Sequence, residues 1–383
     1  MKKLILLKKL FIFNLLILFC ASGMFSLNWS GIIDNNSKIS TSNFSEFTLT
    51  QKNSIYLSAN AKLGKSGLHF SGEAMYQIKE ILPFSNPENS TFINIADLSL
   101  LKISGDYALK KGSLSISAGR FNYYDLTNTV FSQTSDGLYL SYDSMKIKTS
   151  LYAGFTGLLN SLNVTMTDVK TYDYYFYNLA VPYIPVIVDF SYKSFLQTNT
   201  LATQLLCFFE PTGEFTSKYY GTLSLSGPIK TFANYKLNLT VGTQNFNDLM
   251  AYADADFSFF IQQKGIISVG VEYASGNQAV FSPFTTITYQ TGYNAAIAGA
   301  KSSVIIPKLS QLFVTDNMVF SIYEKLVMLA PQDITINGIE FDINYLVNVL
   351  SDVQIAIDAL AYFDFKENLM NNQAITIKAI LSF

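Results

Sequence analysis

The stretch that decides the fold is AITIKAILSF, residues 374–383 of the printed sequence. One parity of this stretch holds Ile375, Ile377, Ala379, Leu381 and Phe383, and the other holds Thr376, Lys378 and Ser382, with Ile380 as the exception. Because successive side chains of a β-strand point to opposite faces, this alternation predicts a strand with one apolar face. Two settings fit such a strand: a membrane β-barrel, or the edge of a soluble β-sandwich.

The same alternation recurs along the chain and begins at Phe47. Residues 47–63 and 68–78 flank the polar turn 64–67, which is the pattern of a β-hairpin. Further alternating segments lie at 95–109, 113–119, 136–142, 146–155, 183–192, 201–209, 219–225, 235–241, 251–259, 267–273, 339–345 and 353–363. The periodicity is blurred over 295–330, where we expect two to four strands. Because a closed bacterial barrel has an even number of strands, we predict 16–18.

Composition separates the two settings. Charged residues make up 14% of the chain and aromatic residues 15%, whereas a soluble domain carries roughly 25% charge. A soluble stack of sandwiches would need polar outer faces, and this chain has too few polar residues to cover them. Beyond the N-terminus there is no apolar run long enough for a membrane helix. We therefore predict an all-β fold: a transmembrane antiparallel up-and-down β-barrel in which short turns alternate with long connections, such as 157–173 and 275–293.

The N-terminus has the features of a secretory signal. Basic residues within 1–9 precede an apolar segment at 10–19, and small residues follow at 21–23, which predicts a signal peptide over 1–25. The alternative is a retained anchor helix. We expect a flexible polar segment over 26–45 and the barrel over 46–383. If Cys20 leaves with the signal, Cys207 is the single remaining cysteine and no intrachain disulfide forms.

A terminal strand that ends in Phe383 resembles the C-terminal signal of bacterial outer-membrane β-barrels. In those proteins the last aromatic side chain faces outwards and the last strand pairs with the first. The resemblance implies location in the cell outer membrane, contact with its lipids, and assembly by the barrel-assembly machinery through the C-terminal strand.

Two further motifs carry a second resemblance. Gly119-Arg120-Phe121 precedes a loop with Asp125 and then the strand Asp136-Gly137-Leu138, and Gly338-Ile339-Glu340 opens a late strand. This arrangement resembles porin-like barrels of the alginate-export and related families. The resemblance implies a porin-like architecture and names no substrate. Arg120 either lines the pore or pins a loop through a carboxylate such as Asp125 or Asp136.

Charged residues on the inward parity are the candidate pore lining. Charge is costly in lipid, so the parity that carries it faces the lumen. The candidates are Glu73, Arg120, Lys146, Lys148, Asp254, Asp256, Glu272, Glu340, Asp342 and Asp358. A mixed, mildly acidic wall favours cations or neutral solutes. The alternative is that these side chains only hydrate the lumen.

These features predict a porin-like outer-membrane channel for passive diffusion of small hydrophilic solutes. The alternative is a structural or adhesive surface-exposed barrel without an open pore. We do not predict an enzyme, because the single histidine, His69, has no nucleophile motif near it. No cofactor or metal site is predicted, and a net charge of −2 without a basic stripe gives no reason to expect nucleic acid as a partner.

Overall fold

The computed structural model describes residues 27–42, 44–64, 67–156, 166–167, 181–261, 264–277, 280–288, 302–330, 334–365 and 372–383. Within them, eighteen strands form one antiparallel sheet. The strands are β1 Leu27–Ser42, β2 Glu46–Leu63, β3 Leu68–Pro83, β4 Thr91–Leu109, β5 Gly112–Tyr124, β6 Ser132–Asp143, β7 Ile147–Phe155, β8 Ile184–Phe195, β9 Asn199–Phe209, β10 Lys218–Lys230, β11 Ala233–Gln244, β12 Met250–Ile261, β13 Gly265–Ala274, β14 Ser303–Val314, β15 Met318–Ala330, β16 Thr335–Asn348, β17 Val353–Asp364 and β18 Asn372–Ser382. A 3₁₀ turn, η1 Pro87–Asn89, lies between β3 and β4. None of the helical segments described is long and apolar enough to cross a membrane.

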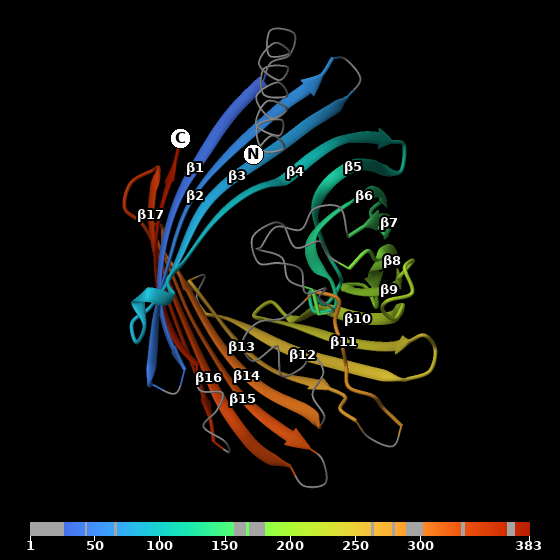
Figure 1. Ribbon diagram of the computed structural model, residues 1–383. Helices are drawn as coiled ribbons and strands as arrows, with labels where there is room; N and C mark the ends of the chain where they lie inside the picture. The colour runs from blue at the N-terminus through green and yellow to red at the C-terminus, as the bar shows by residue number, and fades with distance from the viewer. Residues whose placement is uncertain are drawn as a thin grey trace.

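The sheet is closed by its first and last strands. β1 pairs with β18 from Ile32–Ser382 to Ser42–Asn372, and each strand also pairs with its sequence neighbours. The Gly31 amide donates to the Phe383 carbonyl at 2.8 Å, and the Phe383 amide donates back at 3.0 Å. Figure 1 shows the blue β1 beside the red C-terminal strands. The predicted barrel, its 16–18 strands and the closing role of the last strand are confirmed.

The N-terminal segment corrects one prediction. Most of the stretch expected to be flexible, 26–45, is strand β1, and the barrel therefore begins at Leu27 rather than at residue 46. Its backbone groups bond to β18 on one side and β2 on the other. This pairing orders a segment whose side chains show no apolar parity. The predicted signal peptide, 1–25, lies outside the described residues and stays a prediction.

Side chains alternate between the two faces of the sheet as expected. On β18, Ile375 and Ile377 on the outer face are 56% and 52% exposed, whereas Lys378 bonds to Asp358 on the inner face. Other exposed outward side chains include Leu223 on β10 and Val269 on β13. An apolar outer face around a polar interior is the pattern of a transmembrane barrel.

The two ends of the barrel differ in their connections. At the end where β1 begins and β18 finishes, here called the turn end, the eight connections have two to four residues. The opposite loop end carries the long connections, 156–183 and 275–302. The predicted asymmetry of short turns and long loops is thus confirmed.

The blurred region 295–330 holds two strands, β14 and β15. Their pairing is interrupted between Ile305–Met328 and Lys308–Lys325, around Pro307. Proline has no amide hydrogen to donate to a sheet, which explains both the interruption and the weak sequence pattern.

Candidate channel lining

Two connections from the loop end fold against the inner face of the barrel. The first, residues 125–131 between β5 and β6, is organised by Asp125, which is 4% exposed. Its carboxylate accepts hydrogen bonds from the Thr127 amide at 2.9 Å and the Phe131 amide at 2.8 Å. The Leu126 amide donates to the Gln204 side chain on β9 at 3.0 Å. These bonds fix the connection against the interior wall.

The second inward segment is 280–288, between β13 and β14. Its Ile287 amide donates to the Val130 carbonyl of the first segment at 2.9 Å. The Tyr220 hydroxyl donates to the Thr285 carbonyl at 2.8 Å, and Lys218 lies 3.4 Å from the Thr286 carbonyl. Tyr220 and Lys218 both belong to β10. The first segment therefore contacts β9, the second contacts β10, and together they cover the inner face of these neighbouring strands.

A buried apolar cluster anchors both segments. Tyr123 stacks on Tyr152 with ring centroids 4.4 Å apart, and Phe131 packs on Phe208 at 5.3 Å. The cluster also contains Phe121, Val130, Met166, Val181, Tyr183, Ile187, Leu206, Tyr220, Met250, Tyr252, Ala274, Phe284, Ile287, Val304 and Ile306, and it reaches Val327 on β15 and Tyr362 on β17. We call this part of the interior, the inner face of β5–β14 near the loop end with its covering segments, the capped wall.

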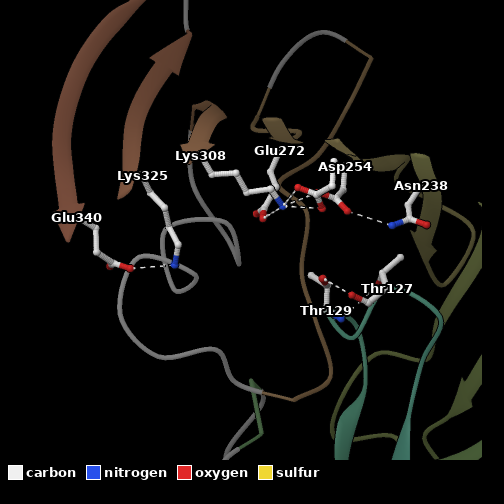
Figure 2. Close-up of polar contacts among 9 residues, drawn as sticks. Thr127, Thr129, Asn238, Asp254, Glu272, Lys308, Lys325 and Glu340 are labelled. Carbon is white, nitrogen blue, oxygen red and sulfur yellow. Dashed lines mark hydrogen bonds and ion pairs between the residues drawn. The ribbon is translucent and has the colours of Figure 1, made fainter. Parts of the chain in front are cut away.

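A charged cluster adjoins the capped wall on β12–β14. The Lys308 ammonium lies 2.7 Å from Asp254, 3.0 Å from Asp256 and 2.8 Å from Glu272. Figure 2 shows this ammonium between Asp254 and Glu272, with Thr127 and Thr129 drawn below them. The three carboxylates were predicted from their parity, and the structure brings them together. Lys308 was missed, because it follows the blurred stretch around Pro307.

The charged side chains continue onto β15 and β16. Lys325 lies 3.1 Å from Glu340, which is 3% exposed. Lys325 is also the register partner of Lys308, so the two ion clusters adjoin (Figure 2). We call Asp254, Asp256, Glu272, Lys308, Lys325 and Glu340 the carboxylate belt. Its four carboxylates outnumber its two ammonium groups.

Two other predicted carboxylates lie next to the belt. Asp342 follows Glu340 by two residues on the same face of β16 and accepts a hydrogen bond from Asn344 at 3.1 Å. Asp358 on β17 forms an ion pair with Lys378 on β18. The acidic part of the inner face therefore extends from β12 to β17.

A second charged sector was not among the predicted pore-lining candidates, although Lys52 and Lys79 fall on the predicted inward parity of their strands. Lys38, Lys52 and Lys79 lie on the inner parity of β1, β2 and β3, and Lys52 is the direct register partner of Lys79. None of the three forms an ion pair with a residue in the described part of the chain. We call them the lysine strip. The signal that could have found them is their shared parity with the inward-facing Ser54 and Gln77.

Two predicted residues are held within the wall. Glu73 on β3 accepts hydrogen bonds from Ser58 at 3.0 Å and Ser99 at 2.6 Å. Arg120 is 6% exposed and pairs with Asp136 at 2.6 Å. Arg120 therefore ties β5 to β6, and its register with β4 places it on the outer parity, opposite the exposed Leu101. This corrects its candidacy as an inward pore residue and favours the pinning role.

The remaining predicted residues lie near the turn end. Lys148 is an exposed inner-parity residue at the start of β7, and Lys146 belongs to the turn before that strand. His69 pairs in register with Lys62. Within the described ranges, no group of His, Cys, Asp and Glu has the arrangement of a metal site. Of the predicted loop 157–173, only Met166 and Thr167 are described, and the Thr167 amide donates to the Ile287 carbonyl at 2.9 Å.

No protein-family model and no curated protein sequence matches the chain. Solved structures from Pseudomonas aeruginosa do. OccK5 (OpdH) has a TM-score of 0.62 at 10% identity, over 93% of this chain and 98% of that one. OpdK, solved with vanillate, has a TM-score of 0.61 at 9% identity, over 93% of this chain and 99% of that one. OprD has a TM-score of 0.56 at 8% identity, over 93% of this chain and 95% of that one. At these identities the likeness shows a shared porin-like barrel fold, and it gives no support to the alginate-export part of the resemblance.

Proposed function

We propose that this chain is a porin-like channel of the outer membrane through which small hydrophilic solutes diffuse passively. One observation carries the proposal: outside the capped wall, the inner face is lined by charged side chains of the carboxylate belt and the lysine strip. The fold similarity to OprD and Occ proteins, which are outer-membrane porins, supports it.

The energetic cost of the lysine strip also favours a water-filled channel over a purely structural barrel. Like charges directly opposite each other in a sheet are destabilising, and Lys52 and Lys79 are such a pair. A structural barrel gains nothing from this arrangement. A water-filled channel that offers positive charge to passing solutes does.

The two charged sectors have different consequences for selectivity. The belt, with its excess of carboxylates, attracts cations next to the capped wall. The strip attracts anions on a separate part of the wall. We expect the belt to dominate because the capped wall narrows the lumen beside it, which gives a modest preference for cations and neutral solutes.

Targeting and assembly belong to the same proposal. A signal peptide over 1–25 would direct export, and the C-terminal strand ending in Phe383 would be recognised by the barrel-assembly machinery. The apolar outer face supports residence among the outer-membrane lipids.

Single-channel recording in planar bilayers tests the function. Protein that shows heat-modifiable mobility, and is therefore folded, is expected to give stepwise openings with a reversal potential that favours cations. The Asp256→Asn variant keeps two carboxylates around Lys308 and is expected to lower that preference at similar conductance. Folded protein that gives no openings would support the structural or adhesive alternative instead.

A further inference from the structure

The described outer face of the barrel carries a polar island on β1 and β2, inside its apolar surface. Asn35 and Ser37 on β1 alternate with Ile33 and Ile39 on the outer parity, and they pair in register with Asn53 and Gln51 on β2. On β18, the outward neighbours of Asn35 and Ser37 are Ala379 and Ile377. We call Asn35, Ser37, Gln51 and Asn53 the amide patch.

The patch lies within the apolar band and not at its rim. On β1 it is bounded by isoleucines on both sides, and on β2 Leu49 and Ile55 bound it in the same way. Ile33, Ile39 and Ile55 are each more than 40% exposed, as expected of lipid-facing side chains. Lipid headgroups at either rim are therefore separated from the patch by apolar residues.

The patch satisfies only part of its hydrogen-bonding capacity. The Asn35 amide donates to the Asn53 side-chain oxygen at 2.6 Å, and the Gln51 amide donates to the same oxygen at 3.4 Å. Ser37 donates to the Gln51 oxygen. The Asn53 amide nitrogen and the Asn35 side-chain oxygen have no partner among the described residues, and both side chains are exposed. Unsatisfied amide groups are costly in hydrocarbon, where no water replaces the missing partner.

We propose that the amide patch is the contact surface for a second copy of this chain in the membrane. Carboxamides carry both donors and acceptors, so the free donor of Asn53 in one copy matches the free acceptor of Asn35 in another. A two-fold interface requires such self-complementarity. The four patch side chains carry no charge, and the exposed Glu80 on β3 lies opposite Gln51 on the same outer face. Polar side chains that bond across an interface are a known means of association in membranes.

The neighbouring strands extend this surface. The Tyr76 hydroxyl donates to the Asn94 side chain at 3.1 Å, and both residues lie on the outer parity of β3 and β4. Elsewhere on the described outer face, Gln311 on β14 has no amide neighbour of this kind. The Asn122–Thr134 pair lies at the loop end of its strands. The self-complementary network is thus confined to β1–β4.

The test uses the folded full-length barrel and the variant Asn35→Leu/Asn53→Leu, which makes the patch apolar without changing charge. Native mass spectrometry and light scattering should show an oligomer for the unmodified protein and a monomer for the double variant. Heat modifiability and conductance should be unchanged, which separates this test from that of channel function. Gln311→Leu is the matched control and should stay oligomeric.

Disulfide trapping in proteoliposomes gives the second readout. In a Cys207→Ser background, Ser37→Cys should form a covalent dimer on oxidation. The natural Cys207, on the outer parity of β9, should not. A monomeric unmodified protein without a Ser37→Cys cross-link, or an oligomer that persists in Asn35→Leu/Asn53→Leu, would overturn the proposal.

Discussion

The capped wall and the lysine strip line the same lumen and are built in opposite ways. In the capped wall, Phe131, Phe208 and Phe284 are fully buried, and polar side chains such as Tyr220 bond to the main chain of the inward segments. In the lysine strip, Lys52 and Lys79 face each other without an ion pair to a described residue. The first region is a buried apolar core, and the second carries an electrostatic cost.

The carboxylate belt lies between these extremes. Two of its carboxylates, Glu272 at 8% and Glu340 at 3% exposure, are as buried as core residues, and each forms an ion pair with a lysine. The inward segments are anchored mainly on β9 and β10, whereas the charged side chains lie on β1–β3 and β12–β16. The inward segments of the capped wall cover part of the inner face, while the belt and the strip give the lumen its charge.

The largest effect should come from loosening the capped wall. Phe131→Ala removes a fully buried ring that packs on Phe208, and such a truncation costs about 3–5 kcal/mol. We expect lower stability in denaturant titrations and a larger single-channel conductance, because the inward segments detach. Phe209→Ala is the control, since Phe209 follows Phe208 on the outer face. Unchanged conductance in Phe131→Ala would show that the capped wall does not narrow the pore.

Breaking the belt should have the next largest effect. Lys308→Met leaves Asp254, Asp256 and Glu272 without their shared cation, and loss of one partner in a buried ion cluster costs about 3–5 kcal/mol. Because Lys308 is still 20% exposed, we expect the lower end of that range, together with stronger cation preference in reversal-potential measurements. Lys308→Arg keeps the charge and should behave like the unmodified protein. Equal reversal potentials in both variants would contradict a role of the belt in selectivity.

The smallest effect on stability should come from the lysine strip. Lys52→Gln removes one charge of a like-charged pair, so its free energy of unfolding should change by only about 0.5 kcal/mol. Its effect should appear in the reversal potential, shifted further towards cations. Lys111→Gln, in the turn between β4 and β5, is the control. A loss of stability without a selectivity change would mean that Lys52 has a structural role.

Period-two alternation predicted the barrel, and β1 shows where this signal ends. β1 carries Asn35 and Ser37 outwards and Asp34, Asn36 and Lys38 inwards, so neither parity is apolar. Its strand conformation is imposed by β18 and β2, whose backbone groups it satisfies on both sides. The residues of one segment do not reveal the hydrogen bonds that neighbouring strands will form with its backbone. This explains the incorrect prediction of a flexible segment.

From the sequence, the candidate site could be predicted only for residues whose inward direction follows from their alternating position in a strand. Parity identified Asp254, Asp256 and Glu272 as inward residues, but it did not identify the lysine that joins them. The inward segments 125–131 and 280–288 carry no periodicity, and they meet through contacts such as Ile287 with Val130, which are far apart in sequence. The capped wall is therefore a tertiary feature that local patterns do not contain.

The pairing of β1 with β18 has a consequence for the order of assembly. Its register joins Ile32 to Ser382, about 350 residues apart, whereas most neighbouring strands are joined by short connections. Contacts between such distant residues form slowly because a long loop must close first. The barrel is therefore open along one seam until its final strand has been synthesised, and both edges of that seam need protection from pairing with other chains. A chain that lacks β18 would leave the outer edges of β1 and β17 unpaired, and such edges are templates for association with other chains.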